Sequence, residues 1–136
     1  KTNKINKIIM KYIKKLLILG FYSANLILIT FYLYPGSIFG YILYGNSSIQ
    51  PQLTRDFIIS SNHLYAFIVL STLGIVAYQN TKKIKFIIVY LFFLSIILEL
   101  FHLIIPNRGF EMSDLFGNII GVILIIIIYK VKDKYV

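Results

Sequence analysis

Residues 84–105 read IKFIIVYLFFLSIILELFHLII, an apolar segment long enough to cross a bilayer that carries Glu99 and His102 within it. A membrane-spanning helix needs about 20 predominantly apolar residues. A charged side chain at the centre of such a helix costs roughly 2.5–3.5 kcal/mol on insertion scales. Glu99 and His102 therefore need a partner or a function, and we expect the specific function of the protein to reside beside them.

The composition indicates a membrane protein. The 136 residues are 58% hydrophobic and have a mean hydropathy of +0.80, whereas soluble globular domains are about 45–50% apolar. A soluble chain of this length has too little interior to bury so much apolar surface, so lipid must be the solvent for part of it. Cysteine is absent, which excludes a disulfide framework, a thiolate nucleophile and a cysteine-ligated metal site.

The apolar segments predict an all-α, polytopic fold with four transmembrane helices in a bundle. The fourth segment is short for a spanning helix, and we expect its helix to begin near Met112. The first segment lacks a small-x-small cleavage site, which favours a retained helix over a signal peptide. A short interfacial helix is expected around Ser37–Tyr44. The predicted spans are Leu16–Tyr34, Phe57–Tyr78, Ile84–Ile105 and Leu115–Tyr129.

Basic residues predict the orientation of the bundle. If the chain crosses the membrane four times, every lysine falls on one side, and only Arg55 and Arg108 fall on the other. Lysine and arginine favour cytoplasmic loops, so both termini are expected in the cytoplasm and the loops at residues 35–56 and 106–114 outside. We therefore interpret the net charge of +9 as a determinant of membrane orientation and of contact with anionic lipid, rather than as a sign of nucleic-acid binding. The lysine clusters are Lys1, Lys4, Lys7, Lys11, Lys14 and Lys15; Lys82, Lys83 and Lys85; and Lys130, Lys132 and Lys134.

Polar and small residues repeat at helical spacing in the last three predicted spans. Side chains three, four and seven positions apart share one face of a helix. We expect these faces to turn toward one another and away from lipid. They are formed by Ser60, His63, Phe67, Ser71 and Gly74; by Ser95, Glu99 and His102; and by Asp114, Asn118 and Gly121.

The depths of these residues predict one shared site. Glu99 precedes Pro106 by seven residues, which places it about 10 Å below the outer end of its helix at about 1.5 Å per residue. His63 and Asn118 lie at a similar depth in their own spans, counted from the same side. The predicted ligand-binding residues are Glu99, His102, His63 and Asn118 in one layer, beneath a lid that carries Arg108, Glu111 and Asp114.

Each of these residues also has a purely structural interpretation. Asp and Ser are common helix N-caps, a Gly-x-x-x-Gly pair is typical of close helix packing, and buried polar side chains often only bond a neighbouring helix. The structural alternatives are an N-cap at Asp114 or Ser113, close packing at Gly117 and Gly121, an interhelical bond at Asn118, a satisfied core histidine at His63, and an ion pair of Arg108 with Glu99, Glu111 or Asp114.

The order of these polar residues resembles the signature of the VanZ-like family of membrane proteins. That family typically shows Glu-x-x-Gln, a Pro-x-Arg turn, two further aspartates, Asn and Gly, together with a His in an earlier span and an aromatic residue four positions after it. The resemblance covers residues 57–125 of a single membrane domain that we expect over residues 1–136. The matching positions are Glu99, Pro106, Arg108, Glu111, Asp114, Asn118, Gly121, His63 and Phe67.

Four positions depart from the family pattern. His102 stands where the family usually has Gln, Glu111 replaces the first Asp, and Ile59 and Ser60 replace an Asp-Lys pair. The resemblance implies a multi-pass protein of the bacterial cytoplasmic membrane with an extracytoplasmic functional face. The founding member of the family is associated with resistance to the lipoglycopeptide teicoplanin.

Three functions fit this pattern. The favoured one is a non-catalytic envelope protein that binds a lipid-linked wall precursor or a glycopeptide-like amphiphile, with Arg108 holding a phosphate or carboxylate. The second is an enzyme acting on a lipid headgroup or a lipid-linked precursor, with Glu99, His63 and His102 as candidate catalytic residues. The third is a structural subunit of an oligomer or of a larger membrane complex.

A metal site is the least favoured interpretation. Glu99 and His102, three residues apart on one helix, can chelate an ion with His63 as a third ligand. This spacing is common by chance, and the family usually has Gln at the position of His102. We therefore expect no metal and no cofactor, and we expect membrane lipids as partners.

Overall fold

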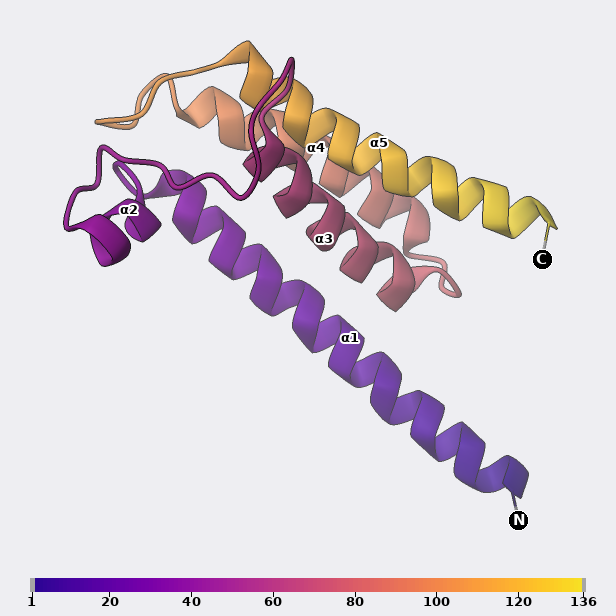
Figure 1. The fold of residues 1–136 in the computed structure, drawn as a ribbon. Helices are drawn as coiled ribbons and strands as arrows, with labels where there is room; N and C mark the ends of the chain where they lie inside the picture. Colours follow the sequence, from indigo (N-terminus) through magenta and orange to yellow (C-terminus); the bar gives the residue numbers. More distant parts are fainter. Residues whose placement is uncertain (1, 136) are drawn as a thin grey trace.

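The computed structural model describes residues 2–135 and contains helices but no strand over that range. Lys1, counted in the N-terminal basic cluster, lies outside the described residues. Four helices are long and apolar enough to cross a membrane, so the all-α prediction with four spans is confirmed (Figure 1). The helices are α1 (Thr2–Leu33), α2 (Ile38–Tyr44), α3 (Ser61–Tyr78), α4 (Ile84–Phe101) and α5 (Met112–Tyr135).

Helices α1 and α5 extend beyond the predicted spans. α1 begins at Thr2 rather than Leu16, and α5 continues to Tyr135 rather than ending at Tyr129. The added segments are rich in lysine and contain no proline. Lysine has a good intrinsic helix propensity, so the local sequence does not end these helices where the apolar segments end. The expected start of α5 near Met112 is confirmed.

The segment before α3 is not helical, although the predicted span included it. Phe57 and Ile58 lie in bends and are 91% and 87% exposed. The carboxylate of Asp56 accepts a hydrogen bond from the backbone N–H of Ser61 at 2.7 Å. Because this bond satisfies a free donor of the first turn, it explains why α3 begins at Ser61.

Helix α4 ends at Phe101, earlier than the predicted Ile105. The ring of Pro106 would clash with the carbonyl four residues before it in a continuing helix, which is that of His102. The chain tightens instead into turns, in which Ile104 donates to the carbonyl of Phe101 at 3.0 Å. The turns carry the residues after His102 out of the helix axis and toward the other loops.

The short helix α2 matches the expected helix around residues 37–44. The Ser37 hydroxyl accepts a hydrogen bond from the backbone N–H of Gly40 at 2.9 Å and caps the helix. The helix ends at Gly45, whose φ of 66° is the left-handed conformation that glycine adopts without strain.

Helices α3 and α5 approach each other through two glycines. A Cβ atom on Gly117 would lie 2.7 Å from the carbonyl oxygen of Ser60, and one on Gly121 would lie 2.8 Å from that of Leu64. Residues without a side chain let two backbones come this close. The predicted Gly-x-x-x-Gly packing is confirmed, and it sets the polar faces of α3 and α5 against each other.

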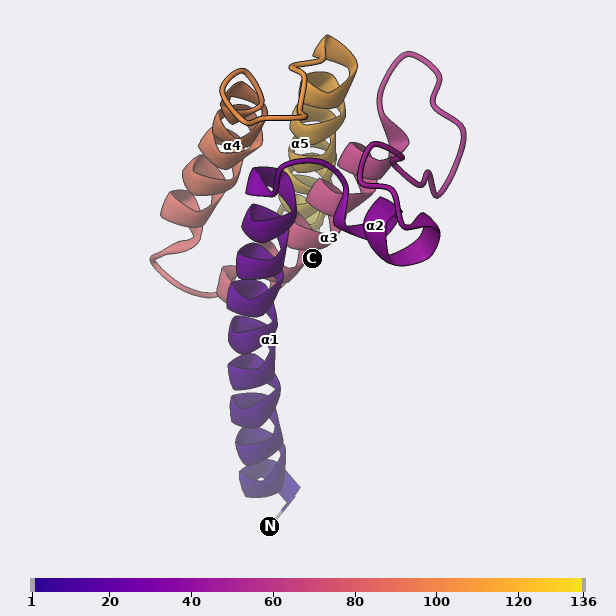
Figure 2. The same cartoon turned by 90° about the vertical axis from the view of Figure 1, so that its left-hand side faces the viewer.

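Helix α1 joins the bundle through its C-terminal half alone. Its described residues up to Leu16 are exposed, whereas Phe21, Asn25 and Tyr32 are buried. Figures 1 and 2 show α1 diverging from the other helices toward its N-terminus. The ring of Phe21 fits against Gly74 of α3, where a Cβ would lie 2.8 Å from a ring carbon.

The bundle has polar residues in its interior and apolar residues on its surface. Leu26, Phe86 and Ile127 are 68%, 70% and 53% exposed, as expected where lipid covers the helices. The buried polar residues come from every long helix and include all three predicted faces. They are Asn25, Ser37, Ser60, Ser61, His63, Ser71, Ser95, Glu99, His102 and Asn118.

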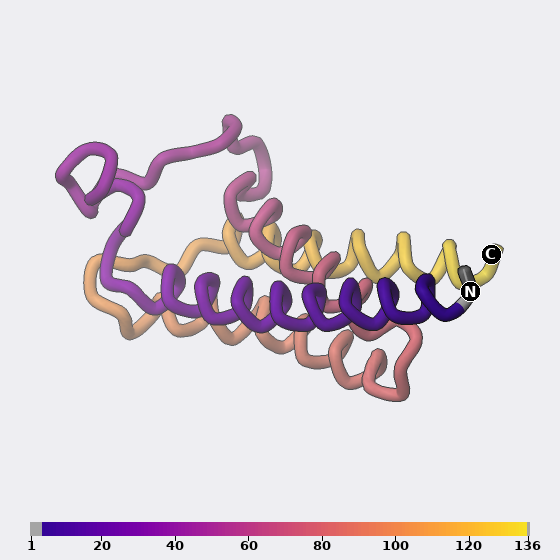
Figure 3. Tube along the Cα trace, turned by 90° about the horizontal axis from the view of Figure 1, so that it is seen from below, coloured from indigo at the N-terminus to yellow at the C-terminus, as the bar shows by residue number. Residues whose placement is uncertain are grey.

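Both termini lie at the same end of the bundle (Figures 1 and 3). The opposite end carries α2 and the loops at residues 34–60 and 102–111, and it is called the loop end below. An even number of crossings puts both termini on one side of the membrane. Which side is cytoplasmic stays a prediction from the positive-inside rule.

The absence of cysteine makes this orientation directly testable. Ser48→Cys at the loop end and Lys134→Cys near the C-terminus both replace exposed residues. A membrane-impermeant maleimide applied to intact cells is expected to label Ser48→Cys, and to label Lys134→Cys only after lysis. The unmodified chain gives the background, and labelling of Lys134→Cys alone in intact cells would reverse the orientation.

Candidate functional site

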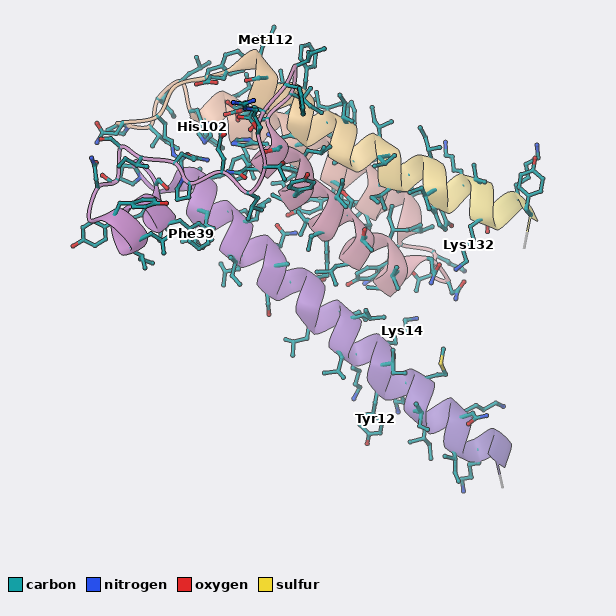
Figure 4. The ribbon with its side chains drawn as sticks, viewed as in Figure 1. Tyr12, Lys14, Phe39, His102, Met112 and Lys132 are labelled. Carbon is teal, nitrogen blue, oxygen red and sulfur yellow. The ribbon has the colours of Figure 1, made fainter. Side chains whose placement is uncertain are left out.

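The polar faces of three helices meet beneath the loop end. α3 contributes His63, α4 contributes Glu99 and the cap residue His102, and α5 contributes Asp114 and Asn118. Figure 4 places His102 at this end, far from Tyr12, Lys14 and Lys132. All of these residues except Asp114 are buried, and Asp114 is partly buried. The structure thus brings together the layer of four residues that the sequence analysis proposed.

Glu99 lies at the centre of this group and is 0% exposed. Its Oε1 atom accepts a hydrogen bond from the backbone N–H of Glu111 at 3.2 Å and faces Nδ1 of His102 at 3.2 Å. Its Oε2 atom has no hydrogen-bond partner and lies 3.7 Å from Nδ1 of His63. One half of the carboxylate is therefore held by the protein, and the other half is left as a buried acceptor.

Tyr32 of α1 completes the group, and sequence reasoning missed it. Its hydroxyl donates to Oδ1 of Asn118 at 2.6 Å and contacts Nδ1 of His63 at 2.9 Å. Its ring stacks on that of His102 at 5.5 Å between centroids, and its carbonyl oxygen faces Nε2 of His102 at 3.1 Å. The available signal was a tyrosine in the last turn of the first predicted span, two residues before its end at Tyr34.

The hydrogen bonds of Asn118 determine which nitrogen of His63 carries the proton. Nδ2 of Asn118 donates to the carbonyl of Ser95 at 3.1 Å, so Oδ1 faces His63 and Tyr32 as an acceptor. The Tyr32 hydroxyl proton is used in its bond to this Oδ1. Nδ1 of His63 therefore faces two oxygens that need a donor, which places the proton on Nδ1.

The other nitrogen of His63 then presents a lone pair. Nε2 lies 3.3 Å from a carboxylate oxygen of Asp114. The neutral ring and the carboxylate both present acceptors across this distance. Three residues each offer one atom that can bind a metal ion, and these atoms lie within 4.8 Å of one another: they belong to His63, Glu99 and Asp114. This set differs from the predicted chelating set, because Asp114 takes the place of His102, whose two nitrogens face Glu99 and Tyr32.

Arg108 makes no ion pair with a carboxylate among the described residues, so the structural alternative of a pair with Glu99, Glu111 or Asp114 is wrong. Its guanidinium instead donates to the carbonyls of Phe31 at 2.7 Å and Tyr34 at 3.2 Å. The last turn of a helix leaves such carbonyls without intrahelical partners, and Arg108 satisfies them at the end of α1. This contact also connects the loop after α4 to α1.

The structural alternative of an N-cap at Ser113 or Asp114 is also wrong. α5 begins at Met112, so both residues lie inside the first turn, and the carbonyl of Glu111 accepts the first bonds of the helix. The Ser113 hydroxyl donates to Glu111 at 3.3 Å. The side chain of Asp114 is thereby free to face His63, while its position in the first turn still suits a negative charge.

A polar cavity of about 140 Å³ opens above this group at the loop end. Arg108, Glu111, Asp114 and His102 line it together with residues from the loops before and after α2. Burial lowers the pKa of the Arg108 guanidinium, which nevertheless stays charged at neutral pH. The cavity therefore presents a fixed positive charge beside two acidic side chains. The other lining residues are Gly36, Ser37, Ser47, Ser48, Gln50, Asn107 and Gly109.

Comparison with known proteins gives one match. The model of the VanZ/LLP1 family matches residues 19–133, a range that contains every residue of the candidate site. No curated protein and no solved structure gives a significant match.

Removing the hydroxyl of Tyr32 is expected to destabilise the bundle. Tyr32→Phe removes one buried hydrogen-bond partner from His63 and one from Asn118, which is expected to lower the free energy of unfolding by about 1–3 kcal/mol. Tyr12→Phe is the matched control, because Tyr12 lies on the same helix and is 62% exposed. Thermal unfolding in detergent, followed by circular dichroism, measures both, and equal melting temperatures for the two variants would contradict the central position of Tyr32.

Proposed function

Because this chain belongs to the VanZ/LLP1 family of membrane proteins, we propose that it is a cell-envelope protein that binds an amphiphile at the loop end. The amphiphile carries a phosphate or carboxylate together with hydroxyl or amine groups, as lipid-linked wall precursors and lipoglycopeptides do. The orientation predicted from the lysines puts the cavity on the outer face of the bacterial cytoplasmic membrane.

The observation that carries this proposal is the position of Arg108 in the cavity wall, where it has no carboxylate partner within residues 2–135. Its Nε, Nη1 and Nη2 atoms donate to Tyr34, Gln50 and Phe31. Each terminal nitrogen keeps one further N–H for a ligand. The contacts orient the guanidinium but do not neutralise it, so an anionic group that enters the cavity meets a pre-positioned charge.

Acidic and neutral polar groups in the same cavity favour a ligand that carries hydrogen-bond donors as well as an anionic group. Glu111 and Asp114 line the cavity beside Arg108, and carboxylates accept hydrogen bonds from hydroxyl and ammonium groups. A simple anion would be repelled by these two side chains. A headgroup with an anionic centre and nearby donors is complementary to both charges.

Apolar surface next to the cavity suits the hydrocarbon part of such a ligand. Leu103 and Ile104, between the cavity residues His102 and Asn107, are 66% and 76% exposed. Tyr41 and Tyr44 of α2 are also exposed at the loop end, where tyrosine rings suit the headgroup level of a bilayer. A headgroup in the cavity can therefore keep its tail in lipid.

Loss of Arg108 is expected to remove the bound amphiphile. Wild type and Arg108→Gln are purified in mild detergent, and the lipids that copurify are quantified by mass spectrometry. An amphiphile with a phosphate or carboxylate is expected with the wild type and is expected to fall roughly tenfold in Arg108→Gln, because a charge-assisted pair contributes about 1.5–3 kcal/mol.

Arg55→Gln is the matched control for this experiment. Arg55 is the other arginine of the chain, is exposed in the loop before α3 and does not line the cavity. It removes the same charge, so it separates specific binding from general attraction to anionic lipid. Equal lipid content in all three proteins would contradict the proposal.

An enzyme is the second candidate, favoured by the buried and unpartnered Oε2 atom of Glu99. A carboxyl group in such a setting is suited to proton transfer. The same mass spectrometry separates the two functions when Glu99→Gln is included. A binding protein yields the same lipid species from both forms, whereas an enzyme yields a different species from the inactive one.

The family is linked to teicoplanin resistance, and this property is testable in cells. A sensitive Gram-positive host that expresses the wild type is expected to tolerate more teicoplanin than one that expresses Glu99→Gln at matched membrane abundance. Equal susceptibility with both forms above the empty vector would exclude Glu99 from the phenotype. Failure of both forms to protect would exclude teicoplanin as the relevant amphiphile.

A further inference from the structure

We propose that His63, Glu99 and Asp114 bind a divalent transition-metal ion of the zinc or manganese type next to the cavity, whose lining includes Asp114. The three residues come from α3, α4 and α5, so the ion would join three helices. One ligand atom from each lies within 4.8 Å of the others.

The spacing of the best-placed pair fits a metal ion. Two ligand atoms that are each about 2.0–2.2 Å from a tetrahedral zinc ion lie about 3.3–3.6 Å apart. Nε2 of His63 and Oδ2 of Asp114 are 3.3 Å apart. The free oxygen of Glu99 lies 3.7 Å from Nδ1 of the same ring, so the Glu99 side chain must rotate to complete the set.

Two of the three groups, Nε2 of His63 and the carboxylate of Asp114, face each other as acceptors. The proton of His63 is on Nδ1, where Tyr32 and Asn118 accept it, so Nε2 presents a lone pair to Asp114. A lone pair and a carboxylate oxygen at this distance repel each other unless a proton or a metal ion lies between them. A metal ion converts all three acceptors into ligands.

The unpartnered Oε2 atom of Glu99 is an independent observation that points to the same ligand. This oxygen is completely buried and has no hydrogen-bond partner, and buried carboxylate oxygens are costly to leave unpaired. It lies 3.7 Å from Nδ1 of His63, which is too far for a hydrogen bond. A bound cation supplies the partner that the protein does not.

Charge and donor type specify the class of ion. Two carboxylates carry two negative charges, and the one nearby arginine directs its guanidinium to carbonyls and Gln50. One imidazole nitrogen with two carboxylate oxygens is a donor set that zinc and manganese accept, whereas magnesium and calcium prefer oxygen alone.

The surroundings supply the features of a prepared metal site. Metal-ligating histidines usually donate their other N–H to a fixed acceptor, as Nδ1 of His63 does. Oε1 of Glu99 is held by the backbone N–H of Glu111. Asp114 lines the cavity, so an ion can enter from there and keep its open positions toward the cavity.

The test is the metal content of the detergent-purified protein, measured without any added amphiphile. The protein is stripped with a chelator, loaded with Zn²⁺ or with Mn²⁺, desalted and analysed by plasma mass spectrometry. About one ion per chain is expected for the wild type, and at least a tenfold weaker affinity for Glu99→Gln and for Asp114→Asn.

Two controls isolate the proposed set of ligands. His102→Gln is expected to retain the ion, because His102 contacts Glu99 without belonging to the set. Asp133→Asn, which removes an exposed carboxylate of α5 far from the site, is also expected to retain it. If His102→Gln loses the metal ion while Asp114→Asn retains it, the proposal is overturned, and His102 rather than Asp114 is the third ligand.

A stability measurement keeps the test independent of poorly folded variants. The melting temperature of the wild type is expected to rise on metal loading, since a ligand that binds the folded state stabilises it, and to fall again with chelator. The proposal would be overturned if the wild type bound no more metal than Glu99→Gln and its melting temperature did not change on metal loading. Neither result depends on the amphiphile, so the proposed function and the metal site fail separately.

Discussion

The carboxylate of Glu99 lies inside a helix bundle whose outer surface is apolar, and every element around it contributes to its burial. In a medium of low dielectric an isolated carboxylate is expensive. The start of α5, the end of α4 and the ring of His63 surround it, and the backbone of Glu111 holds one of its oxygens. The loop between α4 and α5 must therefore turn back over the bundle, and its residues Asn107, Arg108, Gly109 and Glu111 line part of the cavity.

Close helix packing makes this arrangement possible. Gly117 and Gly121 let α5 lie against α3 with no side chain between the backbones, so Asn118, which lies between them, reaches His63 directly. Hydrogen bonds then lock the layer, because the amide of Asn118 is fixed by the carbonyl of Ser95. Packing and polar satisfaction thus specify the same register of the two helices, which leaves little freedom for sliding.

The site has two levels with different chemistry. The upper level is a cavity whose wall carries a fixed positive charge, and the lower level is a group of acceptors with an unpaired oxygen. Arg108 belongs only to the upper level, because its donors are directed to carbonyls at the end of α1. Asp114 belongs to both levels, since it lines the cavity and faces His63. Asp114 would therefore contact both the anionic ligand in the cavity and the cation bound beneath it.

The sequence by itself determined the spans and the polar faces, because a helix that crosses lipid must be apolar over a fixed length and must repeat its buried residues every three or four positions. The contact of Tyr32 with Asn118 joins residues 86 positions apart, and the partners of Arg108 lie 74 and 77 positions away. No local pattern encodes such pairs. Pattern alone also favoured His102 over Asp114 as a companion of His63, because helical spacing reports which residues share a face but not which faces meet. Only the tertiary structure decided that, by the distance to which two glycines let α5 approach α3.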